Sequence, residues 1–155
     1  QYAAYYLGLS GYEKLKRNMI KQSLKDEKFV KINMRAKEFY EKQIKNDIKE
    51  SALLTLDHHK KSGDKVVIVS ASLEILLQYF CKDHGCDLIA NILSSQEGIC
   101  NGNINGRDCN GKEKVKRIND KYNLSDYNKI YAYGDSKFDL PMLEIADYSN
   151  YQTFK

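Results

Sequence analysis

The sequence is short of the residues that mark several classes of protein. It has one proline and no tryptophan, and its nine glycines are scattered, which argues against long disordered linkers. No apolar run approaches the roughly 20 residues that a membrane-spanning helix needs. No secretory signal is recognisable in it. We therefore expect no membrane partner and a cytoplasmic location.

Cysteine pairs of the kind that bind zinc are also missing. Cys81, Cys86, Cys100 and Cys109 are separated by four, thirteen and eight residues, so none forms a Cys-x-x-Cys motif. The three histidines do not complete a zinc site either. We expect free thiols in a reducing compartment.

Charge of one sign is nowhere concentrated. The 25 basic and 21 acidic residues leave a net charge of +4, and the lysines are spread along the chain. Because no basic block alternates with stacking aromatic residues, nucleic-acid binding is not expected. A length of 155 residues suits one domain with a modest core, or a small core with a subdomain.

The first part of the chain has helical periodicity. Apolar residues recur at spacings of three and four, with Lys and Glu on the opposite face. This part is too long for a crossover and too amphipathic for a linker, so we predict a small all-helical cap subdomain over residues 1–47. The apolar stripes are Tyr12, Leu15 and Met19, followed by Phe29, Ile32, Ala36 and Phe39.

From residue 48 onward, helical and strand patterns alternate. A helix over 48–61 is expected to end at Gly63, and the β-branched run 66–69 lacks polar alternation, which suits a strand buried on both faces. This alternation predicts a doubly wound, Rossmann-like parallel α/β sheet over residues 48–155. Further strands are expected at 88–93, 129–133 and 148–154, helices around 115–122 and 140–146, and a hairpin or flap with two Asn-Gly pairs at 98–106.

Two of these elements bring polar residues to places that suit an anion. Ser70 follows the strand 66–69, and its hydroxyl, with the backbone N–H of Ala71 and the next helix start, is typical of an anion site. The alternative is that Ser70 only caps that helix. Lys114 lies near the first turn of a helix, where a cation opposes the helix dipole unless an anion is close. A solvated basic face is the alternative there.

A pair of acids follows the strand at 129–133. Asp135 comes directly after Gly134, and Asp139 lies four residues on, so one helical turn brings it back to the same place. Mg²⁺ prefers hard oxygen ligands, and takes one or two carboxylates with waters and a substrate phosphate. A loop with two exposed acids is the alternative.

Taken in order, these three segments resemble the haloacid dehalogenase-like superfamily, in the branch that contains phosphoserine phosphatase and has a helical cap. The matching segments are 63–73, 111–118 and 133–143. The resemblance implies that Ser70 binds the transferring phosphoryl group and that Lys114 neutralises its charge. It also implies that Asp135 binds Mg²⁺, and that Asp139 binds the ion directly or supports Asp135.

The resemblance further implies a phosphomonoester hydrolase that works through an aspartyl-phosphate. Its substrates would be small phosphorylated metabolites, with phosphoserine as one candidate. Arg17 in the predicted cap is a candidate for a second acidic group of the substrate, although surface arginines on helices are usually only solvated. A haloacid dehalogenase is a weaker interpretation, because that chemistry uses no Mg²⁺.

The nucleophile motif of that family, Asp-x-Asp, occurs nowhere in the sequence. We therefore expect the chain to be a fragment that lacks the first, central strand and is inactive by itself, while the intact protein is an enzyme. The alternative is a non-catalytic phosphate-binding or regulatory remnant of the same fold. The oligomeric state is left open.

Overall fold

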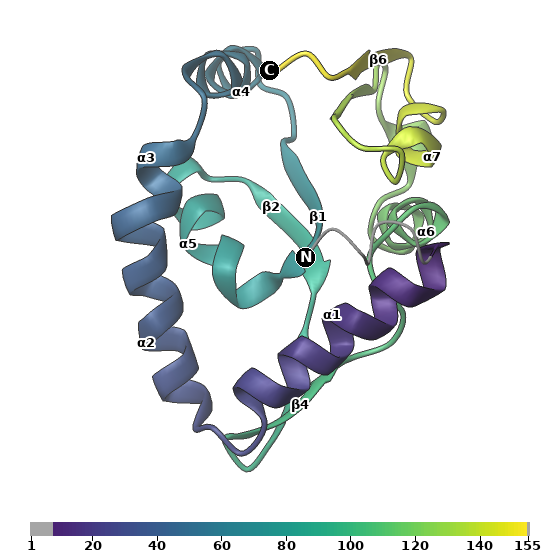
Figure 1. Ribbon diagram of the computed structural model, residues 1–155. Coiled ribbons are helices and arrows are strands. Elements are labelled where there is room, and N and C mark those ends of the chain that lie inside the picture. Colours follow the sequence, from purple (N-terminus) through teal and green to yellow (C-terminus); the bar gives the residue numbers. More distant parts are fainter. Residues whose placement is uncertain (1–7, 155) are drawn as a thin grey trace.

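The structure is a computed structural model that describes residues 8–154, with a helical N-terminal part followed by α/β layers (Figure 1). The N-terminal elements are α1 (Gly8–Leu24), α2 (Phe29–Phe39), a π-helical turn (Tyr40–Ile44), α3 (Lys45–Asp47) and α4 (Glu50–Lys61). The others are β1 (Val67–Leu73), α5 (Glu74–His84), β2 (Asp87–Asn91), β3 (Leu93–Gln96), β4 (Ile99–Ile104), α6 (Lys112–Lys121), a 3-10 turn (Leu124–Asp126), β5 (Tyr131–Gly134), α7 (Leu140–Leu143) and β6 (Tyr148–Tyr151).

The strands form three pairs. β1 lies parallel to β2, β5 lies parallel to β6, and β3 and β4 form an antiparallel hairpin. The predicted parallel α/β architecture is thus confirmed. Within residues 8–154 β1 and β5 do not pair with each other, so each has one unpaired edge. These are the two strands between which the first strand is expected.

The β-branched run before Ser70 is less buried than its composition suggested. Val67, Ile68 and Val69 are only partly buried, so the prediction of a strand buried on both faces is wrong. The physical reason is that β1 lies at the margin of a two-stranded sheet and has β2 on one edge only.

The hairpin reverses at Glu97 and Gly98, both of which have positive φ, and not at either Asn-Gly pair. Asn101 and Gly102 lie within β4. A Cβ atom on Gly102 would stand 2.9 Å from Cα of Lys21, so this glycine lets α1 lie directly against β4. The Asn-Gly signal therefore marks a close approach between a helix and a strand.

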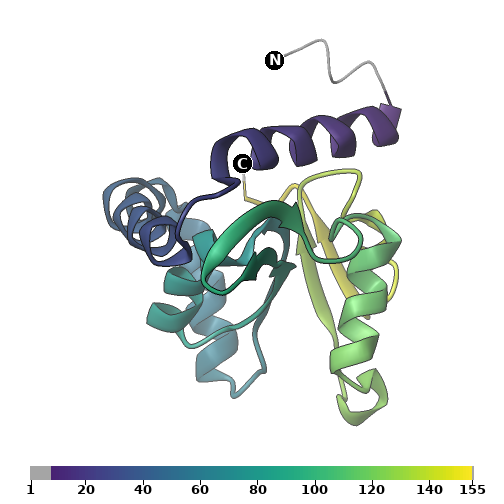
Figure 2. The ribbon, with the colours of Figure 1, turned by 90° about the horizontal axis from the view of Figure 1, so that it is seen from below.

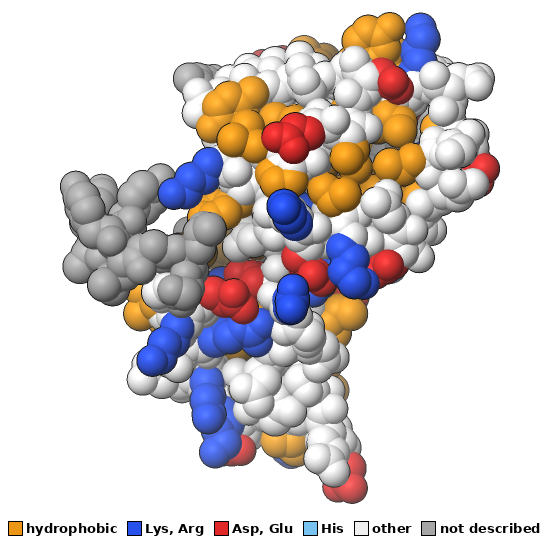
Figure 3. Space-filling model, turned by 90° about the vertical axis from the view of Figure 1, so that its right-hand side faces the viewer, with side chains coloured by type: hydrophobic (Ala, Val, Ile, Leu, Met, Phe, Trp, Pro, Cys, Tyr) orange, Lys and Arg blue, Asp and Glu red, His pale blue; other side chains and the backbone are white. Residues whose placement is uncertain are grey.

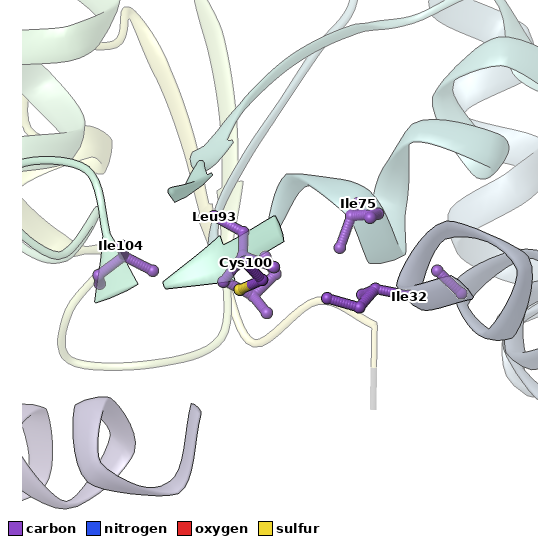
Figure 4. Packing of buried hydrophobic residues seen from close by; sticks show 7 residues of the cluster. Ile32, Ile75, Leu93, Cys100 and Ile104 are labelled. Carbon is purple, nitrogen blue, oxygen red and sulfur yellow. The ribbon is translucent and has the colours of Figure 1, made fainter. Parts of the chain in front are cut away.

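The main cluster of buried side chains joins the helical part to the α/β part (Figure 4). Ile32 and Ala36 of the predicted α2 stripe are buried in it and Phe29 packs against it, but Phe39, the last residue of that stripe, is exposed. The predicted stripe of α1 is not buried: Tyr12, Leu15 and Met19 are exposed, because α1 packs with its Ile20 and Leu24 side instead. The boundary between a cap over 1–47 and a core over 48–155 stays a prediction. The cluster consists of Ile32, Ala36, Leu73, Ile75, Leu93, Cys100 and Ile104.

None of the helices in the described part of the chain is long and apolar enough to cross a membrane. On the face shown in Figure 3, acidic and basic side chains are intermixed, and they do not form a continuous basic block. The four cysteines are free thiols, as predicted.

Candidate active site

Lys114 connects β1 to the loop that follows β5. Its Nζ donates a hydrogen bond to the carbonyl oxygen of Val69 in β1 at 3.1 Å, and it forms an ion pair with Oδ1 of Asp139 at 2.5 Å. Lys114 is only 6% exposed, although it lies in the first turn of α6. The structure therefore brings Lys114 and Asp139 together next to Ser70, which follows Val69 directly.

Asp139 is held from both sides. Its Oδ2 accepts the backbone N–H of Ser136 at 3.0 Å and that of Asp135 at 3.3 Å, while Oδ1 faces Lys114. Burial opposes the charged form, yet the pKa of this carboxyl is lowered because Lys114 and the Ser136 N–H donate to it. Both oxygens of a charged Asp139 are thus already engaged.

Asp135 is the acid of this loop that remains open to a ligand. It is exposed, and its carboxylate accepts no hydrogen bond from any other residue in the range 8–154. That range contains no cluster of three or more His, Cys, Asp or Glu side chains able to hold a metal by themselves. One free carboxylate still fits Mg²⁺, which commonly completes its shell with waters and phosphate oxygens.

Ser70 lies where β1 departs from its ladder with β2. Val69 pairs with Ile89 and Leu73 pairs with Asn91, so three residues of β1 lie opposite one residue of β2. The backbone of β1 therefore bulges at Ser70 and the two residues after it. The Ser70 Oγ accepts the backbone N–H of Ser72 at 3.0 Å. Helix α5 begins only at Glu74, so its first turn lies beyond this bulge.

Arg17 lies apart from these residues in its contacts. Its guanidinium donates to the carbonyl oxygen of Gly106 at 2.8 Å and forms an ion pair with Glu13 at 2.9 Å. Over residues 8–154, no hydrogen bond or ion pair links it to Ser70, Lys114 or Asp135. Its role in substrate binding stays a prediction.

Three residues beside this site were not predicted. Lys16 of α1 and Asn91 at the end of β2 both donate to the carbonyl oxygen of Ala71, at 2.5 and 2.6 Å. Both also contact the buried carboxylate of Asp108. Asn91 is the last residue of β2, but the strand was expected over 88–93, so the sequence did not place Asn91 at a strand end. Lys16 had no signal in the sequence either, because it is one of many lysines on an amphipathic helix.

The family model for haloacid dehalogenase-like hydrolases matches residues 1–144. Protein CicA of Caulobacter vibrioides strain NA1000 is 31% identical over 144 residues, which are 92% of this chain and 64% of that protein. A histidinol-phosphatase of Neisseria meningitidis serogroup C is 29% identical over 120 residues, which are 71% of this chain and 53% of that protein. The chain thus spans less than two thirds of the length of these relatives.

Solved structures agree with the fold. A protein of unknown function from Bordetella pertussis Tohama I has a TM-score of 0.81 at 24% identity, over 88% of this chain and 64% of that one. A phospho-aspartyl intermediate analogue of phosphoserine phosphatase has a TM-score of 0.56 at 28% identity, over 88% of this chain and 63% of that one. These similarities confirm the α/β architecture expected from the three matching segments.

Proposed function

Because the chain belongs to the haloacid dehalogenase-like hydrolase family, we propose that the intact protein is a Mg²⁺-dependent phosphatase that acts on small phosphomonoesters. The observation that carries this proposal is Lys114, a buried cation that bonds both to Val69 of β1, directly before Ser70, and to Asp139 in the loop after β5. A fixed positive charge between a hydroxyl and an acidic loop suits a phosphoryl group, whose transfer depends mostly on positioning and charge stabilisation.

Each site residue has a role in this proposal. The Ser70 hydroxyl donates to a phosphoryl oxygen, and Lys114 balances the negative charge that gathers during transfer. Asp135 would hold Mg²⁺, which supplies further charge neutralisation when bound. Asp139 acts through its hydrogen bonds to the backbone N–H groups of Asp135 and Ser136, and so keeps Asp135 in place.

The nucleophile is proposed to come from a segment outside these 155 residues. No Asp-x-Asp is present in them, and the relatives are longer than this chain. In the proposed reaction, the first Asp carboxylate of the Asp-x-Asp in that segment attacks phosphorus, the bond to the leaving oxygen breaks, and the leaving alcohol takes its proton from the carboxyl group of the second Asp. Water then attacks the aspartyl-phosphate and releases inorganic phosphate. This route is supported by similarity to a phosphoserine phosphatase that is 28% identical to this chain and whose structure is that of a phospho-aspartyl intermediate analogue.

A second candidate function is a non-catalytic phosphate-binding remnant, which the missing Asp-x-Asp favours. Both candidates are separated by assaying the intact protein against a panel of small phosphomonoesters, including phosphoserine and histidinol phosphate. Phosphate release above the level of a heat-denatured control supports the phosphatase. Binding of inorganic phosphate without release from any substrate supports the remnant, and the absence of both overturns both.

A further inference from the structure

The backbone of Ala71 is held by side chains in place of a neighbouring strand. Because β1 bulges between Val69 and Leu73, the carbonyl of Ala71 is not part of the β1–β2 ladder. It accepts instead from Nδ2 of Asn91 at 2.6 Å and from Nζ of Lys16 at 2.5 Å. Two donors on one carbonyl fix the direction in which it points.

A buried carboxylate holds both donors in place. Asp108 has a side chain that is 3% exposed, and its Oδ1 forms an ion pair with Lys16 at 2.5 Å and accepts from Asn91. Its Oδ2 accepts from Nδ2 of Asn110 at 3.0 Å. Asn91 is fully buried, and its Oδ1 accepts the backbone N–H of Cys109 at 2.9 Å. Every buried side-chain N and O atom of this network has a hydrogen-bond partner, and such networks are rigid.

The planarity of the peptide bond carries this orientation to Ser70. The carbonyl of Ala71 and the N–H of Ser72 belong to one peptide unit, and in a trans peptide they point in opposite directions. When Lys16 and Asn91 fix the carbonyl, they also fix the N–H of Ser72. That N–H donates to Oγ of Ser70 at 3.0 Å, which leaves the Ser70 hydroxyl hydrogen free to be donated elsewhere.

We propose that Lys16 is a positioning residue for the phosphate site, because it orients the hydroxyl of Ser70 through the peptide between Ala71 and Ser72. The inference rests on the proposed binding of a phosphoryl group by Ser70. Lys16 comes from α1, which lies across both halves of the α/β part (Figure 2) and also stacks Tyr12 on Phe138 of the acidic loop at 6.4 Å. Docking of α1 and phosphate binding are therefore coupled.

The test uses the intact protein and two constants that report phosphate binding. These are KM for p-nitrophenyl phosphate and the dissociation constant of inorganic phosphate, measured by calorimetry. Loss of a hydrogen bond from a charged donor is expected to raise both by about tenfold in Lys16→Met. Lys14→Met is the matched control, because Lys14 is an exposed lysine two residues away on the same helix, and both constants stay at wild-type values in it.

A purely structural role for Lys16 gives a different result. If Lys16→Met only reduces the fraction of folded molecules, the apparent kcat falls while KM and the phosphate dissociation constant stay at wild-type values. That outcome overturns the proposal. Because Lys16→Met leaves the Asp108 carboxylate short of its cation, Lys16→Met/Asp108→Asn is also measured. This double variant lacks the unpaired charge and is still expected to bind phosphate weakly. Recovery of wild-type binding in it also overturns the proposal.

A double-mutant cycle shows whether Lys16 acts through Ser70. In a Ser70→Ala background, Lys16→Met is expected to cost no further phosphate affinity, since the group that it positions is gone. Fully additive effects contradict the inference while the phosphatase proposal stands. A wild type that binds phosphate without hydrolysing any substrate overturns the phosphatase alone, and the same cycle then tests Lys16 by calorimetry. A wild type that neither binds nor releases phosphate overturns the phosphatase proposal and the inference about Lys16 together.

Discussion

Gly134 and Asp139 approach each other so closely that no side chain fits at position 134. A Cβ atom there would stand 2.5 Å from Cβ and 3.1 Å from Cγ of Asp139. The loop after β5 thus folds back onto the strand end and brings the Asp139 carboxylate to the backbone N–H groups of Asp135 and Ser136. The spacing Gly-Asp-x-x-x-Asp is explained by this contact.

Gly134→Ala is expected to disrupt the acidic loop. The added methyl group pushes Asp139 away from Lys114, and forced overpacking of this kind costs about 1–3 kcal/mol of stability. Urea denaturation measures the stability, and calorimetry with inorganic phosphate measures the site, which should bind much more weakly.

Gly63→Ala is the control for this change. Gly63 has a φ of +81° at the end of α4, and a Cβ there meets no atom within 4 Å. Gly63→Ala should lower the free energy of unfolding by about 1 kcal/mol through backbone strain alone, and the variant should keep wild-type phosphate affinity. Equal loss of phosphate binding in both variants contradicts the account of Gly134.

Lys114→Met is expected to weaken both the fold and phosphate binding. It leaves the carboxylate of Asp139 buried without its cation, and breaking a buried ion pair in this way costs about 3–5 kcal/mol. In Lys114→Met/Asp139→Asn the buried charge is removed, so stability should largely return while phosphate affinity does not. Lys112→Met, an exposed lysine in the same turn, should change neither property. Wild-type phosphate binding by the double variant would show that Lys114 has only a structural role.

The ion pair also predicts how stability depends on pH. The pKa of the Asp139 carboxyl is below its ordinary value of 3.8 in the folded protein, so its charged form favours folding. This stabilisation is complete above the unfolded value near pH 4 and is lost as the pH falls through the lower folded value. When urea denaturation is measured from pH 6 down to pH 3, the free energy of unfolding should therefore decrease less in Asp139→Asn than in the wild type. Asp87 also has a lowered pKa, mainly through its bond from Tyr122, so part of the decrease remains. Identical pH profiles rule out this role for Asp139.

The cysteines are expected to react slowly with thiol reagents in the folded protein. Burial raises the pKa of Cys81 to about 12 and also raises that of Cys109, while Cys100 is fully buried. Burial also raises the pKa of the Cys86 thiol, but Cys86 is only half-buried, so a reagent reaches it more easily and it should react before the other three. All four should react at once in urea. Rapid reaction of all four in the native protein contradicts the packing described for these residues.

The candidate site residues were proposed from the sequence because they were expected to follow strand ends, whereas the structure places Ser70 within β1, at its bulge. Parallel strands place their carboxyl ends at one edge, so Ser70 and Asp135 could be expected to lie near each other without knowledge of any contact. Lys114 could be added because a lysine at a helix start is unfavourable unless an anion is near. The sequence could not show that Lys114 pairs with Asp139, because the loop after β5 has two carboxylates, Asp135 and Asp139, and either could be the partner of the lysine.

Other features depended on tertiary packing that local patterns do not encode. The α1 stripe of Tyr12, Leu15 and Met19 has ideal helical spacing but is exposed. A different side of α1 packs inward, since Gly102 has no side chain and so allows α1 to lie against β4. Lys16 and Asp108 are ordinary charged residues in the sequence, and only the fold brings them together. Which side of an amphipathic helix is buried, and which charges pair, is decided by neighbours far along the chain.

The most direct test of the phosphatase account is phosphate release by the intact protein in the presence of Mg²⁺, compared with Asp135→Asn. The wild type should release phosphate, chelation of Mg²⁺ should abolish that release, and added Mg²⁺ should restore it. Loss of a metal-binding carboxylate should lower the rate by about 100-fold or more in Asp135→Asn, with the folded fraction unchanged because this side chain is exposed. Phosphate release that survives both chelation and Asp135→Asn would contradict the assignment of Asp135 to the metal and, with it, the proposed mechanism.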